Sequence, residues 1–229
     1  MAERSGLQGK IWLGIESSAR QGGVALVRGS EVLAELLVPV TADYSEKVLP
    51  AVEELLARTG VCPEDIGGIG VSVGPGSYTG LRIGSATAMG ISRGWNRPAK
   101  GVPTLRALAL AAPDDRPVLV CTRARDGEVF ASAYMGKQPF CPELFPPGVY
   151  TAEAVALWVA DLEDMVGVGS GRSELTPDTV RWLHPSMDLP RPSAVAVIAA
   201  ELARREGPDH HIQPLYLRSF GQKAVDVVP

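Results

Sequence analysis

A glycine-rich stretch, GPGSYTGLRIG at 74–84, is the part of this 229-residue sequence whose residue types most suggest chemistry. It follows an apolar segment, 66–73, and its last residues begin a segment of helical periodicity, 80–94. Glycine-rich turns at the start of a helix present backbone N–H groups to anions. The spacing matches no Walker A loop, and the third glycine of a dinucleotide fingerprint would fall at Thr79. The stretch indicates either a weak phosphate site or a tight turn that lets the helix pack closely.

A second polar group follows the first apolar run, 11–15. A carboxylate and hydroxyl groups at a strand end can face a phosphate, but Glu16 is longer than the aspartate usual in such hairpins. We interpret this group as a vestigial phosphate site, with no firmly bound cofactor and no metal ligand expected. Its residues are Glu16, Ser17, Ser18, Gly76 and Ser77.

Other enzymatic readings have weaker support. The segment 70–74 matches the nucleophile-elbow string GxSxG, but Ser72 lies between two valines in a predicted strand rather than on a sharp turn. A serine hydrolase also needs a histidine in a supporting context, and none of the three histidines has one. The three cysteines are far apart, so neither a zinc site nor a disulfide framework is predicted.

Composition limits the class of protein. The chain is 45% hydrophobic, which excludes a disordered protein, and its net charge of -4 argues against a simple basic nucleic-acid binder. The N-terminus has no apolar run of the signal-peptide kind, and the most apolar glycine-rich stretch, 66–91, contains Arg82 and eight glycines. We expect a cytoplasmic location and no membrane association.

The order of the predicted elements indicates an α/β fold. Three strands, 11–15, 24–27 and 32–38, precede a helix at 45–59, and Gly29-Ser30 fits the hairpin turn between the second and third. For this helix a capping box from Asp43 and Glu46, or a cap by Ser45, is expected at the start, and Gly60 at the end. Strand 66–73 and a helix at 80–94, with Thr79 as its cap, follow. This is the order of a ribonuclease-H-like half.

The rest of the chain is predicted with less regularity. Further elements are helix 104–111, strands 118–121 and 128–134, a proline-rich loop at 136–148, helix 153–159 and a last helix at 194–205. We expect an N-terminal lobe of 8–105 plus 193–218, to which the last helix returns. A smaller second lobe would span 106–192, and 1–7 and 219–229 would be flexible tails.

The helix at 80–94 carries two stripes of small residues. Gly80, Gly84 and Ala88 form one, and Ala86 and Gly90 form the other. Each interior glycine costs about 1 kcal/mol relative to alanine, so such a stripe indicates close approach of another backbone. Packing within the chain explains one stripe, and the second suggests a partner helix. The segment 79–106 has five basic and no acidic residues, whereas 43–59 is mainly acidic, so the two helices could pair with a similar pair on another chain.

The strings LGIESSARQGGVALV, YSEKVLPAVEELL, GPGSYTGLRIG, GVPTL, RARDGEVFASAY and PLYLR together resemble the bacterial TsaB (YeaZ) family over nearly the whole chain. The resemblance implies an actin/Hsp70-like (ASKHA) fold of two ribonuclease-H-like lobes, the second reduced. It also implies a scaffold subunit in the synthesis of threonylcarbamoyladenosine at position 37 of tRNA. In that family the paralogue TsaD performs the transfer, and TsaE joins the complex.

The resemblance also implies where partners bind. TsaD would bind across the two helices, the isolated chain would form a homodimer, tRNA would be met through the complex, and ATP or ADP could lie at the subunit junction. Two positions depart from the family pattern: Tyr44 replaces a histidine and Arg123 an aspartate, which weakens any case for intrinsic catalysis. The alternatives are a nucleotide-hydrolysing ASKHA enzyme and a glycoprotease-type peptidase. The predicted interface residues are Ser45, Val48, Leu49, Val52, Leu56, Tyr78, Arg82, Ser85, Ala88 and Met89.

Overall fold

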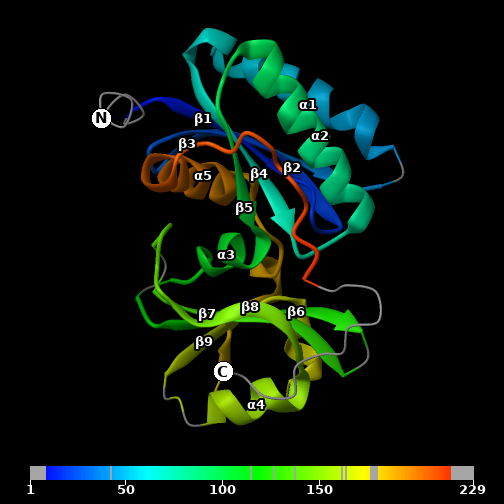
Figure 1. The fold of residues 1–229 in the computed structure, drawn as a ribbon, viewed down its shortest axis with the longest axis vertical. Helices are drawn as coiled ribbons and strands as arrows, with labels where there is room; N and C mark the ends of the chain where they lie inside the picture. The colour runs from blue at the N-terminus through cyan, green and yellow to red at the C-terminus, as the bar shows by residue number, and fades with distance from the viewer. Residues whose placement is uncertain are drawn as a thin grey trace. The chain divides into compact units, whose positions relative to one another are not determined.

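A computed structural model describes residues 9–41, 43–113, 115–125, 127–136, 138–160, 162, 164–175 and 180–217. The predicted tails, 1–7 and 219–229, lie outside the described residues. The chain folds as two compact units, Met1–Ala107 with Pro190–Leu215 and Leu108–Leu189 with Tyr216–Pro229. Each unit contains one five-stranded sheet, so the α/β class is confirmed (Figure 1).

The sheet of the first unit has the order β3-β2-β1-β4-β5. Its strands are β1 (Ile11–Glu16), β2 (Gln21–Arg28), β3 (Glu31–Pro39), β4 (Ile66–Gly74) and β5 (Ala99–Pro103). Strand β2 pairs antiparallel with both β1 and β3, and Gly29-Ser30 forms the turn between β2 and β3 as predicted. Strand β4 runs parallel to β1, and β5 runs parallel to β4. All residues of β1 and β4 are buried, as expected for central strands with helices on both faces.

Helices cover both faces of this sheet. On one face lie α1 (Tyr44–Thr59) and α2 (Tyr78–Trp95), whose apolar residues share a core with Leu13, Ile15 and Val71. On the other face lies α5 (Pro192–Glu206), which approaches β1 so closely that a Cβ at Gly14 would lie 2.1 Å from the Pro192 carbonyl oxygen. Figure 1 shows α1 and α2 side by side, with the sheet between them and α5.

The ends of α1 and α2 differ in detail from the sequence predictions. Asp43 precedes α1 without a side-chain cap, so the capping box and the cap by Ser45 are wrong, while Gly60 ends the helix in the left-handed conformation as predicted. Thr79 is not the cap of α2, because the Ser77 hydroxyl accepts from the Gly80 N–H at 3.2 Å. This cap lengthens α2 by about one half-turn at its start.

The second unit repeats the topology of the first. Its sheet has the order β10-β9-β6-β7-β8, and β6 pairs antiparallel with β7 and parallel with β9. Read from β6, this is the same order as that of the first sheet, with β6 in the place of β1. The strands are β6 (Pro117–Arg125), β7 (Glu128–Met135), β8 (Glu143–Thr151), β9 (Met165–Val168) and β10 (Val180–Trp182).

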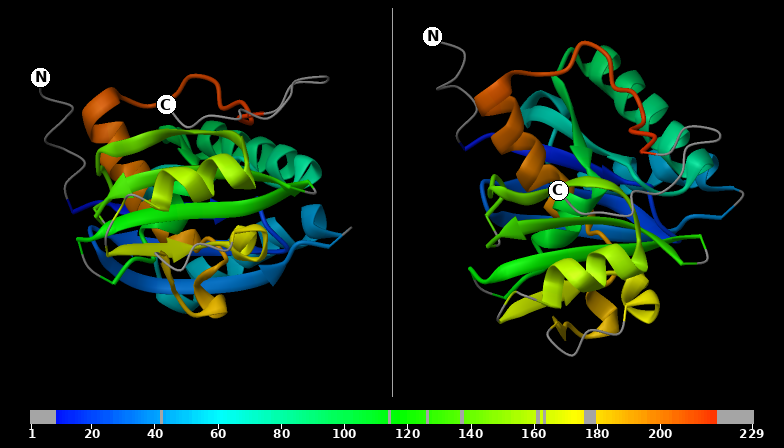
Figure 2. Two further views of the ribbon diagram at one scale, coloured as in Figure 1. Left: turned by 90° about the horizontal axis from the view of Figure 1, so that it is seen from below. Right: turned by 60° about the horizontal axis from the view of Figure 1, so that its bottom comes forward.

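The predicted reduction of the second lobe lies in its helices and its last strands. The counterpart of α1 is α4 (Ala152–Ala160), and the counterpart of α2 is only a 3₁₀ turn, η2 (Ser170–Glu174). Figure 2 shows α4 lying along the sheet, where Val155 and Val159 join its core. A short α3 (Thr104–Ala109), and the 3₁₀ turns η1 (Pro63–Asp65) and η3 (Pro185–Met187), complete the elements.

The prediction of a loop at 136–148 is wrong for its second half, because β8 begins at Glu143. Pro146 and Pro147 suggested a loop, but β8 is an edge strand, where proline is tolerated. The pairing with β7 is interrupted between Ala131 and Ala133, opposite the prolines. The Ser132 hydroxyl fills this gap by donating to the Phe145 carbonyl oxygen at 2.8 Å.

The segment after α5 covers the edge strand β5. The Asp209 N–H donates to the Ala99 carbonyl oxygen at 2.8 Å, and the Asp209 carboxylate accepts from the Gly101 N–H at 2.8 Å. The same carboxylate lies 2.9 Å from the buried ammonium group of Lys100, which also pairs with Glu206 at 3.0 Å. No helix in the part of the chain that the structure describes is both long and apolar enough to cross a membrane.

Asp209→Ala should lower the free energy of unfolding by about 2–3 kcal/mol, because it removes one partner of a buried charge and one acceptor of a backbone N–H. Urea unfolding of the full chain measures this. Glu54→Ala is the control, since it breaks only the exposed ion pair with Arg58 and should cost about 0.5 kcal/mol or less. Equal effects of the two variants would contradict the role given to Asp209.

Candidate functional site

The face of α1 that points away from the sheet is polar with one large apolar side chain. Tyr44, Val48, Ala51, Val52 and Leu55 are buried, whereas Leu49 is 47% exposed. The other exposed residues are mainly charged and are Ser45, Glu46, Lys47, Pro50, Glu53, Glu54, Ala57 and Arg58. Lys47 pairs with Asp43 at 2.7 Å, so the free charge on this face is negative. The outer face of α1 could therefore contact a basic or apolar partner surface.

The two stripes of small residues on α2 have different surroundings. A Cβ at Gly80 would lie 2.1 Å from the Ser17 carbonyl oxygen, and one at Gly84 would lie 2.1 Å from the Ser17 hydroxyl. Ala88, next on this stripe, is buried against the sheet. The first stripe thus packs within the chain, as one of the two readings predicted.

The second stripe is exposed. Ala86 and Gly90 are both open to solvent, and Gly94 continues the row one turn further. A Cβ at Gly90 or at Gly94 would meet nothing within 4 Å. Arg82, at the start of the same row, lies over the ring of Tyr78 at 4.0 Å. This leaves a smooth surface along α2 that a second backbone could approach.

The predicted interface residues divide into three groups by their exposure to solvent. Val48, Val52, Ser85 and Ala88 are buried in the chain, so the prediction that they face a partner is wrong for these four. They lie on the inward side of each helix because the sheet takes the apolar periodicity that suggested them. Leu56 and Met89 are half-buried. Ser45, Leu49, Tyr78 and Arg82 are exposed and remain candidates for partner contact.

Two members of the basic run on and after α2 have polar partners within the chain, and the charge of one, Lys100, is neutralised by carboxylates. The guanidinium group of Arg97 donates to the Glu64 carbonyl oxygen at 2.8 Å, and Lys100 is buried between two carboxylates. The electrostatic attraction that this run offers to an anionic partner is correspondingly smaller than the sequence suggests.

The residues of the predicted phosphate site do lie together, at the hairpin between β1 and β2 and the loop before α2. Glu16, Ser17 and Ser18 are all buried, however. One Glu16 carboxylate oxygen accepts from the Ser18 N–H and hydroxyl, both at 2.5 Å, and the other has no partner among the described residues. Burial raises the pKa of the Glu16 carboxyl group to about 7, although its bonds with Ser18 act in the opposite direction.

Most groups that could bind a phosphate have partners inside the chain, although the buried Ser17 hydroxyl has none among the described residues. The Ser77 N–H donates to the Ser18 carbonyl oxygen at 2.7 Å, and the Ser77 hydroxyl caps α2. A Cβ at Gly76 would lie 2.3 Å from the same Ser18 oxygen, so the glycine serves close packing of loop on hairpin. In this arrangement the hydrogen bonds of Ser77 and the close approach of Gly76 join the loop, the hairpin and the start of α2.

Sequence reasoning missed two members of this cluster. The Tyr44 hydroxyl donates to the Glu16 carbonyl oxygen at 2.7 Å, and the Ser72 hydroxyl accepts from the Ser17 N–H at 3.1 Å. Tyr44 could have been found, since it stands four residues before Val48 on the apolar stripe of α1. Ser72 lies inside β4, as the sequence indicated, and not on a nucleophile elbow. Within the described ranges, no group of three or more His, Cys, Asp and Glu side chains is arranged to hold a metal ion.

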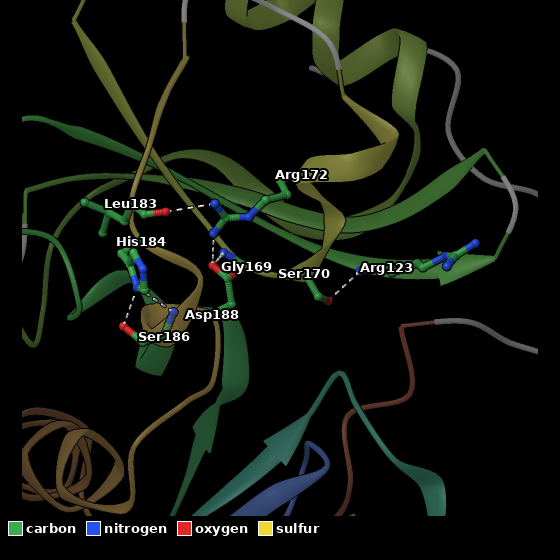
Figure 3. Close-up of polar contacts among 8 residues, drawn as sticks. All are labelled: Arg123, Gly169, Ser170, Arg172, Leu183, His184, Ser186 and Asp188. Carbon is green, nitrogen blue, oxygen red and sulfur yellow. Dashed lines mark hydrogen bonds and ion pairs between the residues drawn. The ribbon is translucent and has the colours of Figure 1, made fainter.

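Arg123, the second departure from the family pattern, belongs to a polar network in the second unit (Figure 3). Its N–H donates to the Ser170 hydroxyl at 3.2 Å, and its Nε lies 3.1 Å from a Glu174 carboxylate oxygen. Nearby, Asp188 accepts from the Gly169 N–H at 2.9 Å and pairs with Arg172. These contacts hold η2 on the sheet, so the network has a structural role in the second unit.

Comparisons with known proteins find similar sequences and a similar fold. The sequence model of a family described as TsaD, tRNA N6-adenosine threonylcarbamoyltransferase, matches residues 38–138. The tRNA threonylcarbamoyladenosine biosynthesis protein TsaB of Bacillus subtilis is 27% identical over 90% of this chain and 93% of its own length. The Escherichia coli protein of the same name is 34% identical over 53% of this chain and 54% of its own.

A solved structure shares the fold. YeaZ from Pseudomonas aeruginosa superposes with a TM-score of 0.78 at 24% identity, over 91% of this chain and 100% of that one. The two-unit arrangement of strands described above is thus a fold that occurs in that protein.

Gly80→Ala should lower the free energy of unfolding by about 2–3 kcal/mol, because the new Cβ would overlap the Ser17 carbonyl oxygen and force hairpin and helix apart. Gly90→Ala, in the same helix, should instead stabilise the chain by up to about 1 kcal/mol. Thermal and urea unfolding measure both. A stabilised Gly80→Ala variant would show that α2 does not pack on Ser17 as described.

Glu16→Gln should remove a pH dependence of stability. The folded-state pKa of about 7 lies above the usual value of 4.5, so the wild-type chain loses stability as pH rises from about 4.5 to 7. At 1.36 kcal/mol per pKa unit, the variant should be more stable than wild type by at most about 3 kcal/mol at pH 8 and similar at pH 4.5. Urea unfolding at both pH values tests this, and a difference independent of pH would contradict it.

Proposed function

We propose that the chain is a member of the TsaB (YeaZ) family and a subunit of the machinery that makes threonylcarbamoyladenosine in tRNA. Its role is to support a catalytic TsaD subunit, which transfers threonylcarbamoyl to adenosine 37. Two curated relatives that carry the TsaB name match 90% and 93% of this chain, which supports the assignment to this pathway.

A non-catalytic role fits the state of the candidate polar groups. Glu16 is buried, and the Ser77 N–H and hydroxyl have partners inside the chain. The Ser72 hydroxyl, in β4, accepts from the Ser17 N–H. Groups committed in this way stabilise the fold and are not presented to a substrate. This disfavours the nucleotide-hydrolysing enzyme and the peptidase as functions.

The exposed row on α2 is the observation that carries the proposed mode of partner binding. Interior helix glycine reduces stability, so a row of small residues with nothing against it is best explained by a backbone that approaches there in the complex. Leu49 on α1 supplies an apolar anchor beside it. We place the TsaD contact on the outer faces of α1 and α2.

The other partners follow from the same surface. Without TsaD, a second copy of the chain would cover the outer faces of α1 and α2, and the two copies would form a homodimer. The acidic α1 of each copy would then face Arg82 or Arg93 of the other copy. TsaE would join after TsaD, ATP or ADP would lie at a subunit junction, and tRNA would be bound through the complex.

Leu49→Arg should abolish co-purification with the TsaD subunit, or weaken its binding at least about tenfold, because a desolvated cation replaces an apolar anchor. Leu157→Arg is the matched control, since it makes the same change at a leucine that is 67% exposed on α4, in the second unit. Pull-down and calorimetric titration with purified TsaD measure both.

Both variants should unfold at the wild-type temperature, since both leucines are exposed. Retention of TsaD by Leu49→Arg at wild-type affinity would contradict the proposed surface. Loss of TsaD binding by Leu157→Arg alone would move the surface to the second unit.

A further inference from the structure

Glu16 connects three segments that are distant in the sequence. Its carboxylate holds the N–H and hydroxyl of Ser18, and the Ser18 carbonyl oxygen in turn accepts from the Ser77 N–H in the loop before α2. Its own carbonyl oxygen accepts from the hydroxyl of Tyr44, the first residue of α1. The starts of both helices are therefore tied to one residue at the end of β1.

Among the described residues, no cation contributes to the surroundings of this carboxyl group. The hairpin and β4 provide serine hydroxyls, and α1 provides the ionisable side chain of Tyr44, which donates to the Glu16 carbonyl oxygen. On the other side, α5 presents the Pro192 carbonyl oxygen and Ala196 to β1 at Gly14. An ionised Glu16 thus keeps a buried oxygen without a donor, among the described residues, and its charge also acts unfavourably on ionisation of Tyr44.

We propose that Glu16 is a positioning residue whose protonation state controls how firmly the starts of α1 and α2 are held together. The protonated carboxyl group is accommodated in the closed arrangement. The ionised group is stabilised by any opening of the hairpin that admits water, and such an opening loosens the bonds from Ser77 and Tyr44 at the same time. Only the consequence for TsaD binding rests on the proposed function.

Amide hydrogen exchange of the isolated full chain tests the central step. The reporters are the Ser77 N–H, which donates to Ser18, and the Glu46 N–H in the first turn of α1. With a folded-state pKa of about 7, opening at these amides should rise roughly tenfold from pH 6 to pH 8.5 beyond the intrinsic base catalysis, which amides of β7 report.

Three variants separate the parts of this coupling. Glu16→Gln should abolish the extra pH dependence at both reporters, and Glu153→Gln, which removes a carboxylate from the exposed start of α4, should leave it unchanged. Tyr44→Phe should abolish it at Glu46 while leaving it at Ser77. The inference is overturned if wild-type exchange at both reporters follows the β7 amides over this range, a result that does not depend on any variant being folded.

The pH dependence of TsaD binding is a second measurement, and it would not change if Glu16 had only a structural role. For the wild type and for Glu153→Gln, the dissociation constant for TsaD should increase severalfold from pH 6 to pH 8.5. For Glu16→Gln it should not change over this range. If the wild type does not bind TsaD at any pH, the proposed function fails, and hydrogen exchange still decides the present inference. If TsaD binds with the same pH profile to both variants, the link from Glu16 to partner binding is refuted.

Discussion

The backbone and hydroxyl of Ser17 lie so close to α2 that only glycine fits at Gly80 and Gly84. This contact sets the depth and rotation of α2 on the first sheet. Once Gly80, Gly84 and Ala88 face inward, the helix must turn Arg82, Ala86 and Gly90 outward, since they lie on another side of the same cylinder. The outer surface, on which the proposed function depends, is therefore a consequence of a steric requirement on the inner one.

The polar cluster at the end of β1 illustrates how an arrangement typical of a phosphate site can serve the fold instead. The position is where a strand end, a hairpin and a helix start come together, and such places in α/β folds commonly bind ligands. In this chain Ser18 and Tyr44 donate hydrogen bonds to Glu16, and Glu16 is buried. Tyr44, which departs from the family pattern, thus adds a hydrogen bond that joins α1 to the end of β1.

Much of the first unit could be predicted from the sequence, because its helices and strands show clear periods and long apolar runs. Helix 45–59 was found at Tyr44–Thr59, and Gly60 ends it as predicted. The second unit was harder. Its β9 and β10 have four and three residues, too few for a period to appear, and the prolines of β8 conceal an edge strand. For the site, periodicity could mark Val48 and Val52 as apolar but could not tell which side of the helix meets the sheet, and the pairing of Tyr44 with Glu16 spans 28 positions in the sequence.

The most direct test of the account is a hydrogen-exchange footprint of the full chain with and without the TsaD subunit. We predict slower exchange in α1 and α2 on complex formation, centred on Leu49 and on Ala86 to Gly90, with α4 unchanged. Protection confined to α4 or to the sheet of the second unit, with α1 and α2 unchanged, would contradict the central claim that the outer faces of these two helices form the partner surface.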